Sequence, residues 1–236
     1  MDLDTVFLSR LQFGFTIAFH IIFPTFTIGL SAYIATLLVM WQRTGRERYR
    51  VLARFWTRIF GVSFGMGVVS GIVLSYQFGT NWSRYSAVLG NVVGPLMGYE
   101  VLTAFFLEAT FLGIMLFGWN RVPPWLHVLS AVLVALGTVT SAFWILSANS
   151  WMQYPTGYVM RGGIVYPFDW IAAIFSPTFP WRLVHMATAA YLTTAFVVLS
   201  VGARYLLAGI HLDHAHTMLR MAMAMAAVLA PAQLIF

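Results

Sequence analysis

The sequence of 236 residues contains no cysteine and no lysine, and only 8% of its residues are charged. The absence of cysteine excludes disulfides, cysteine-ligated iron–sulfur clusters and covalent c-type haem attachment, and it leaves the redox compartment open. A soluble domain carries about 25% charged residues, whereas 60% of this chain is hydrophobic. The composition therefore favours a protein that is surrounded by lipid rather than by water.

The basic residues number 13, all of them arginine, and give a net charge of +6. They are spread along a mostly apolar chain, and they form no basic patch with interleaved aromatic residues of the kind that binds nucleic acid. We therefore expect no nucleic-acid partner. In a membrane protein, the main effect of such arginines is to orient the helices.

Long apolar runs divide the chain into candidate membrane spans, each of which needs about 20 residues. The runs lie at about residues 13–41, 59–78, 92–119, 124–148, 183–203 and 221–236. The first run is not a signal peptide, because Asp2 and Asp4 stand where a basic n-region belongs. The last run reaches the end of the chain without a polar anchor. We therefore expect residues 1–236 to form a single all-α membrane domain, a polytopic transmembrane helix bundle with five complete spans and a truncated sixth.

The arginines orient these spans. The segment after the first span, which we take as a loop, contains one acid, Glu47, and six arginines: Arg43, Arg46, Arg48, Arg50, Arg54 and Arg58. The positive-inside rule places this loop in the cytoplasm and the N-terminus outside. Alternation then places residues 149–182 outside. We expect this segment to be a partly structured interfacial loop, because it is rich in aromatic residues: Trp151, Tyr154, Tyr158, Tyr166, Trp170 and Trp181.

Four ionisable residues stand within the predicted spans: His20, Glu100, Glu108 and His185. Such groups are expensive in hydrocarbon, at about 2.5–3.5 kcal/mol for Arg, Lys or Asp at a helix centre, so they are functional candidates by default. Glu100 and Glu108 are eight residues apart. On an α-helix this spacing gives about 12 Å of rise and about 80° of rotation, so both carboxylates can face the same interior wedge at different depths.

The four residues suit two kinds of chemistry. Imidazole is a common axial ligand of haem iron, so His20 and His185 can serve two haems or share one. Desolvation favours the protonated carboxyl group, so two glutamates at different depths can take up and release protons as a relay. A single histidine in a membrane helix can instead only hydrogen-bond a neighbouring helix, and this alternative stays open for both histidines.

Other polar and small residues have simpler interpretations. His127 follows two prolines and is expected at the membrane surface, while the histidines around Asp213 are expected in a solvated loop rather than a metal site: His211, His214 and His216. Four glycines in the second span are typical of close helix–helix contact: Gly61, Gly65, Gly67 and Gly71.

Several strings together resemble subunit I of the cytochrome bd-type quinol oxidases, and most of all their cyanide-insensitive branch. The strings are SRLQF at 9–13, QFGTNW at 77–82, YEVLTAFFLEATFLG at 99–113, NSWMQ at 149–153 and VHM at 184–186. They occur in register over essentially the whole chain. The combination of QFGTNW with a helix that carries two glutamates is far more specific than one short motif.

The resemblance implies roles for five residues of this sequence. His20 would be an axial ligand of one haem of the high-spin pair, either the haem d or the haem b, and His185 an axial ligand of the low-spin haem b. Glu100 would be a carboxylate at the haem d site. Glu108 and Ser141 would lie on the proton path from the cytoplasm. Ala109 stands where some relatives have serine, which leaves that part of the relay less defined.

The resemblance also implies a reaction and its partners. Electrons from quinol reduce oxygen to water in the bacterial inner membrane, and protons taken from inside and released outside build a gradient without pumping. The cofactors would be a low-spin haem b, a high-spin haem b, and either haem d or a third haem b. The protein partners would be a smaller subunit II and, in some members, a single-helix third subunit. Family members have nine helices, so we expect this chain to be an N-terminal fragment that is inactive alone.

Two alternatives from other functional classes remain open at the level of sequence. The chain can be a proton channel or transporter that uses Glu100 and Glu108 without haem. It can also be a structural membrane subunit whose histidines only bond between helices. A haem absorption spectrum separates the oxidase from both alternatives.

Overall fold

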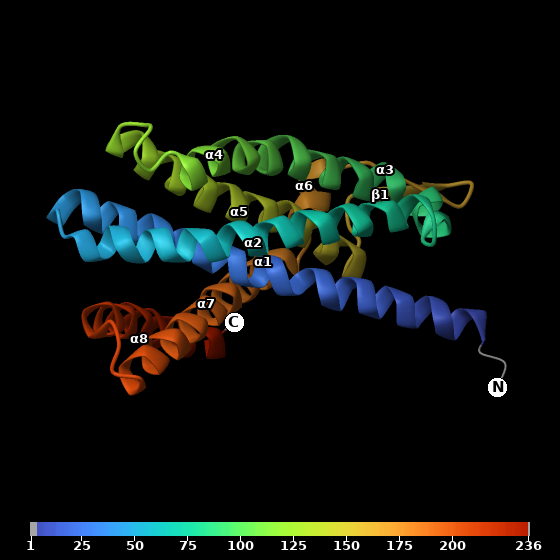
Figure 1. The fold of residues 1–236 in the computed structure, drawn as a ribbon. Coiled ribbons are helices and arrows are strands. Elements are labelled where there is room, and N and C mark those ends of the chain that lie inside the picture. The colour runs from blue at the N-terminus through green and yellow to red at the C-terminus, as the bar shows by residue number, and fades with distance from the viewer. Residues whose placement is uncertain (1–3, 236) are drawn as a thin grey trace.

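The computed structural model describes residues 4–235, and helices dominate it (Figure 1). Its elements are α1 (Thr5–Thr44), α2 (Glu47–Gly79), α3 (Ser83–Glu100), the π-helix η1 (Val101–Phe105), α4 (Phe106–Phe117), α5 (Pro124–Gln153), β1 (Tyr158–Arg161), β2 (Ile164–Pro167), α6 (Trp170–Ile174), α7 (Phe179–Leu207) and α8 (Leu212–Ile235). The predicted all-α class is confirmed. Asp2 and Phe236, which entered the prediction of the first and last spans, lie outside the described residues.

Within residues 4–235, six helical segments are long and apolar enough to cross a membrane. Figure 1 shows the α1–α2, α4–α5 and α7–α8 connections at the same left-hand end of the molecule. A side-chain contact joins two of these connections, because Arg50 Nη2 donates a 2.7 Å hydrogen bond to Oδ1 of Asn120. Successive long helices therefore run in opposite directions, as a polytopic bundle requires. The number of complete spans and the external N-terminus stay predictions.

The prediction of an arginine-rich loop between the first two spans is wrong, because most of this segment is helical. Arg43 lies in the last turn of α1, and four of the other arginines lie on α2. Only Gly45 and Arg46 separate the helices. Gly45 ends α1 in a left-handed conformation, with φ of 65°, and its N–H bonds to the Trp41 carbonyl. The apolar run marks the part of a helix that needs lipid, whereas glycine marks where the helix ends, so α1 and α2 both extend beyond the predicted spans.

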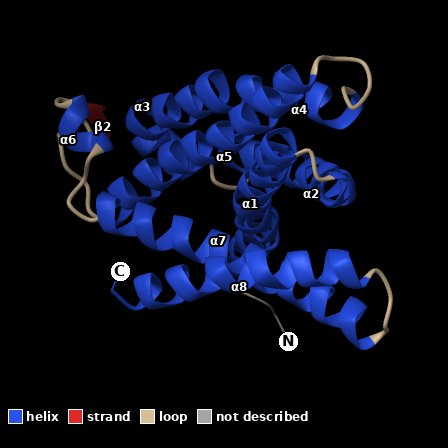
Figure 2. Cartoon of the chain, turned by 90° about the vertical axis from the view of Figure 1, so that its left-hand side faces the viewer, coloured by secondary structure: helices blue, strands red, loops and turns tan. Residues whose placement is uncertain are grey.

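The core lies where α1 meets α2, α5, α7 and α8. Its fully buried side chains include Trp56, Leu30, Ile34, Leu37 and Phe60. Figure 2 shows α3 and α4 together on one side of α5, with α7 and α8 on the other. Membrane helices associate by close packing and interhelical hydrogen bonds rather than by water exclusion. One such bond fixes α5 against α1, since Ser31 Oγ lies 3.1 Å from Thr138 Oγ1 in a buried position.

Three of the four glycines predicted to mark helix contacts do so. A Cβ at Gly61 would lie 2.9 Å from Leu116, one at Gly67 3.3 Å from Phe23, and one at Gly71 3.3 Å from His20. The prediction is wrong for Gly65, where a Cβ would meet nothing within 4 Å among the described residues. The glycine face of α2 therefore gives α1 and α4 room to approach.

The segment between α5 and α7 is partly structured, as predicted, while its interfacial position stays a prediction. β1 and β2 form an antiparallel hairpin with Tyr158 opposite Pro167, and α6 follows it. Asn91 on α3 donates a 3.0 Å hydrogen bond to the Val165 carbonyl and holds the hairpin against the bundle. Trp151 was predicted to be interfacial but is 1% exposed, because α5 continues through it and it packs in a small second core.

Candidate functional site

A π-turn separates the two intramembrane glutamates. Glu100 is the last residue of α3, η1 follows it, and Glu108 lies in the first turn of α4. The N–H of Phe106 bonds to the carbonyl of Val101, five residues back. A π-turn takes up about one residue more than an α-turn. The eight-residue segment therefore makes close to two whole turns, and the two carboxylates fall within about 20° of one another instead of about 80° apart.

Both glutamates face α5. Ser141 Oγ donates a 2.7 Å hydrogen bond to Oε1 of Glu100. Glu108 packs against Gly137, where a Cβ would lie 2.6 Å from the Glu108 Cγ. Gly137 and Ser141 are four residues apart, which places them one turn apart on the same face of an α-helix. The structure thus brings Ser141 together with Glu100, and places Glu108 one turn of α5 away.

Glu108 is the more enclosed of the two glutamates. Its residue is 6% exposed, and its Oε1 is buried with no hydrogen-bond partner among residues 4–235. Glu100, by contrast, is only partly buried and is bonded to Ser141. A buried carboxylate oxygen without a partner carries a large desolvation penalty, which ordinary packing does not offset. Such a group is a candidate for exchanging protons or for bonding to a group that the described chain does not contain.

His20 lies at the contact of α1 with α2, where its Nδ1 is 2.9 Å from Ser70 Oγ. Ser70 Oγ also lies 3.0 Å from the Gly67 carbonyl. When the Ser70 hydroxyl donates to that carbonyl, Ser70 Oγ accepts the proton of His20 Nδ1 and leaves the Nε2 lone pair free. Nε2 of His20 has no hydrogen bond within residues 4–235. This arrangement resembles that of metal-ligating histidines, whose other ring nitrogen donates to a fixed acceptor.

His185 lies far from His20 along the chain, on α7, and its side chain is exposed. Its polar neighbour is Gln233 on α8, whose Nε2 lies 2.9 Å from Nδ1 and 3.1 Å from Nε2 of the imidazole. One amide nitrogen that is close to both ring nitrogens cannot satisfy both with good geometry. His185 thus presents an imidazole at the surface of the described helices with at least one nitrogen poorly paired.

The other histidines differ in part from their predicted settings. His127 was expected at the membrane surface, but it is 2% exposed, bonds through Nε2 to the Met115 carbonyl at 3.0 Å, and packs on the Trp119 ring. The first turn of α5 is covered by the end of α4, which explains the burial. Within the described part of the chain, no group of three His, Cys, Asp or Glu side chains is placed to hold a metal ion. The loop predicted around Asp213 is wrong, because Asp213, His214 and His216 lie in the first turns of α8, with His211 just before it.

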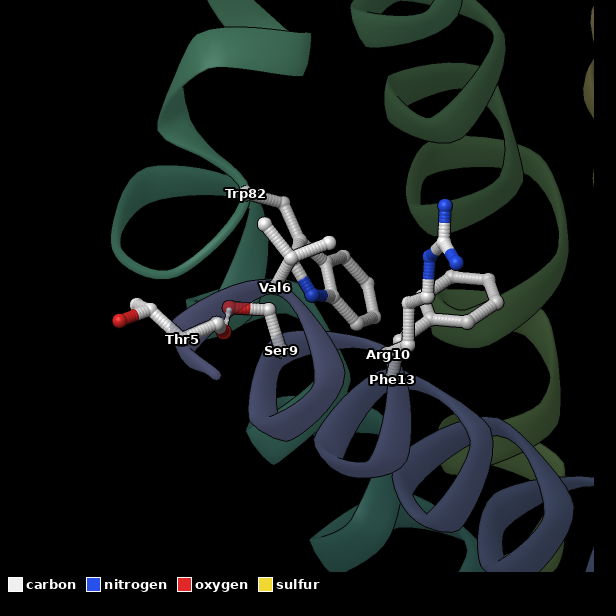
Figure 3. A pocket seen from close by; sticks show the side chains of 6 residues that line it. All are labelled: Thr5, Val6, Ser9, Arg10, Phe13 and Trp82. Carbon is white, nitrogen blue, oxygen red and sulfur yellow. Dashed lines mark hydrogen bonds between the residues drawn. The ribbon is translucent and has the colours of Figure 1, made fainter. Parts of the chain in front are cut away.

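Two of the recognisable strings meet at the N-terminal end of α1. Gln12 Nε2 donates to Gln77 Oε1 at 2.8 Å, and Trp82 Nε1 donates to Gln12 Oε1 at 3.3 Å. Phe13 packs on the Trp82 ring, with centroids 5.1 Å apart. Figure 3 shows the shallow pocket beside them, of about 340 Å³, lined by Thr5, Val6, Ser9, Arg10, Phe13 and Trp82. None of the predicted site residues lines this pocket, so it belongs to the junction of the strings rather than to the glutamates or histidines.

Comparison with known proteins places the chain in one family. A sequence profile of the family described as "Cytochrome bd terminal oxidase subunit I" matches residues 8–236. The chain is 40% identical over 211 residues to Cytochrome bd-II ubiquinol oxidase subunit 1 of Escherichia coli, with 87% of this chain and 40% of that protein covered. It is 40% identical over 200 residues to Cytochrome bd ubiquinol oxidase subunit 1 of Bacillus subtilis, with 85% and 43% covered.

A solved structure shares the fold. The bd oxidase of Geobacillus thermodenitrificans contains a chain that superposes with a TM-score of 0.92 at 32% identity, over 98% of this chain and 53% of that one. The chain thus spans less than half the length of the two curated relatives. The match runs through both glutamates and both histidines of the spans, and the chain belongs to the cytochrome bd terminal oxidase subunit I family.

Proposed function

We propose that this chain contributes haem ligands and proton-carrying carboxylates to a respiratory quinol oxidase. The relatives are named as ubiquinol oxidase subunits. We therefore propose that this chain belongs to a quinol:oxygen oxidoreductase, which oxidises quinol and reduces oxygen to water. The single observation that carries the proposal is the buried Oε1 of Glu108, which has no hydrogen-bond partner within residues 4–235 and lies on the candidate membrane span that also carries Glu100.

The histidines fit haem. His20 has its Nδ1 within hydrogen-bond distance of Ser70 and no bond at Nε2 within residues 4–235, and His185 exposes an imidazole that Gln233 satisfies only in part. Neutral imidazole held by a second hydrogen bond is the usual form of a haem-ligating histidine. We propose that His20 binds a high-spin haem and His185 a low-spin haem b. Bound haem would supply the electron transfer and the oxygen chemistry, with haem d or a third haem b completing the set.

The carboxylates would carry protons. Reduction of oxygen to water consumes one proton for each electron, and these protons must enter a site that is surrounded by hydrocarbon. Glu108, deep in the bundle, would accept a proton on the cytoplasmic side, and Glu100 would deliver it near the haem. Ser141 would hold Glu100 at that position through its 2.7 Å hydrogen bond. A hydroxyl can both donate and accept, so Ser141 can also pass a proton along the path.

The proposed setting is the bacterial inner membrane, with the N-terminus outside. The connection between α1 and α2 has arginines on both sides of it, and the positive-inside rule places it in the cytoplasm. The oxidase would also contain a smaller subunit II and, in some forms, a single-helix third subunit. These partners would cover apolar surface that the described helices expose, such as Ile72 and Val73 on α2.

The test is quinol-dependent oxygen uptake by the oxidase, purified with all its subunits. The variant Glu108→Gln removes the exchangeable proton and keeps the shape of the side chain. Turnover should fall by about 100-fold or more, since a positioned acid–base group contributes on the order of 10²–10⁴-fold, while the haem spectrum is kept. The matched control is Glu47→Gln on an exposed part of α2. Unchanged turnover in the Glu108→Gln variant would contradict the proton role.

A further inference from the structure

Gly137 on α5 occupies an unusual position opposite Glu108. A Cβ built on Gly137 would lie 2.6 Å from Glu108 Cγ, 3.4 Å from its Oε1 and 3.5 Å from its Cδ. These three atoms of one side chain are the nearest neighbours of that position. Any residue other than glycine would therefore collide first with Glu108.

This contact differs from ordinary close packing between membrane helices. At Gly29 on α1, a Cβ would meet both the Thr194 side chain and the Ala190 carbonyl, so glycine there lets two backbones approach. At Gly137, no backbone atom of another helix is among the three nearest atoms. Glycine in a helix interior costs about 1 kcal/mol relative to alanine. At Gly137, the glycine costs this helix stability, and the space that it leaves is filled by the side chain of Glu108 alone among its three nearest atoms.

If a side chain were added at position 137, Glu108 rather than helix α5 would have to move. α5 is fixed to α1 by the buried contact of Thr138 with Ser31, at the position next to Gly137. One turn further along, α5 is fixed to α3 by the bond from Ser141 to Glu100. The helix therefore cannot withdraw easily. Because Cγ is close to the backbone of Glu108, relieving the collision would have to turn the whole carboxyl group away from α5.

We propose that Gly137 is a positioning residue, whose bare Cα leaves the space that holds the Glu108 carboxyl group in line with Glu100 and Ser141. The inference rests on the proposed function, since the alignment matters only if Glu108 passes protons. Gly137 has no side chain that could exchange a proton, so its proposed role is only to position one that does. Gly137 acts through Glu108, and it sets the side-chain position rather than the proton affinity of any group.

The functional test uses the oxidase with all its subunits and the variant Gly137→Ala. Turnover should fall by about 10- to 100-fold, as a displacement of about 1 Å in a reacting group does, while the haem absorption spectrum stays intact. The infrared carboxyl band that disappears in Glu108→Gln should shift in Gly137→Ala. The matched control is Gly113→Ala on α4, where a Cβ meets nothing within 4 Å of the described chain. Wild-type turnover and an unshifted band in Gly137→Ala would overturn the inference.

A stability cycle tests the geometry independently of activity. Gly137→Ala should lower the unfolding temperature of the oxidase in the wild-type background, and it should not do so in a Glu108→Ala background, where Cγ is absent. If Gly137→Ala does not assemble, the double variant should assemble. Equal destabilisation in both backgrounds would overturn the inference. If Glu108→Gln keeps full turnover while this coupling is observed, the proposed proton role fails and the steric role of Gly137 stands.

Discussion

Ser141 on α5 donates a 2.7 Å hydrogen bond to Oε1 of Glu100, and this bond joins α5 to the end of α3 at the start of the π-turn. Two further contacts of α5 flank it. Trp144 Nε1 donates to Thr103 Oγ1 at 2.8 Å, and its ring stacks on Tyr99 with centroids 5.2 Å apart. The π-turn between α3 and α4, the two helices that carry Glu100 and Glu108, is therefore held by side chains from α5. These contacts fix where the Glu100 carboxylate lies.

Replacing Ser141 by alanine should release Glu100. The loss of one hydrogen bond to a carboxylate is expected to cost about 1–3 kcal/mol and to lower turnover by about tenfold or more. Oxygen uptake and the unfolding temperature of the purified oxidase measure the two effects. The control is Thr140→Ala, since within residues 4–235 the Thr140 side chain bonds only to the Leu136 carbonyl of its own helix. Ser141→Thr, which keeps a hydroxyl, should retain most of the activity, and a loss equal to that of Ser141→Ala would contradict the role of the bond.

Replacing Ser70 by alanine should disturb the ligand role of His20 without removing the imidazole. His20 Nδ1 would lose its hydrogen-bond partner, so the ring would be free to rotate. Changes of this kind lower metal affinity by about 10- to 100-fold, and the absorption band of one high-spin haem should shift or weaken. Ser63→Ala is the control on the same helix, because Ser63 has no side-chain hydrogen bond within residues 4–235. An identical spectrum in Ser70→Ala and wild type would contradict the assignment.

Replacing His185 by alanine should remove the low-spin haem signal selectively and leave the high-spin bands. Electron entry from quinol should then fall, because the receiving haem is lost. Absorption spectra of the purified variant measure this directly. The control is His216→Ala, an exposed histidine on α8 near the α7–α8 connection. If His185→Ala and His216→Ala give the same spectrum, His185 is not the ligand.

The absence of cysteine makes the orientation testable with single introduced thiols. Met160→Cys lies on the hairpin, where Met160 is 61% exposed, and Leu212→Cys lies at the start of α8. A membrane-impermeant maleimide should label this chain at position 160 in intact cells, and at position 212 only after the membrane is opened. The cysteine-free parent gives the background. Labelling of position 212 but not of position 160 in intact cells would contradict the predicted orientation and indicate the opposite one.

The sequence allowed the helical class, the approximate positions of the apolar runs and the residues of interest to be predicted. These features follow from composition and from the cost of burying ionisable groups, both of which are local. Helix ends were less predictable, because Gly45 and not the last apolar residue ends α1. The burial of Trp151 and of His127 depends on which helices cover them, and no local pattern records that.

The π-turn between Glu100 and Glu108 and the contacts of these two residues could not be predicted from the sequence. Residues 101–105, VLTAF, contain no glycine or proline, so nothing marks the π-turn. The family resemblance indicated Ser141, but its hydrogen bond to Glu100 was not predicted, since the packing of α5 brings the two residues together. No sequence motif includes Gly137. Only the position of Glu108 across the interface gives it a distinct role.

The central claim is that these helices carry haem in an oxidase that uses quinol. The most direct measurement is a reduced-minus-oxidised absorption spectrum of the complex purified through this chain, recorded together with quinol-driven oxygen uptake in the same sample. We predict bands of a low-spin haem b and of high-spin haem, together with oxygen uptake that stops when quinol is withheld. A folded, fully assembled sample with no haem band would contradict the account and would favour a haem-free proton channel or a structural subunit.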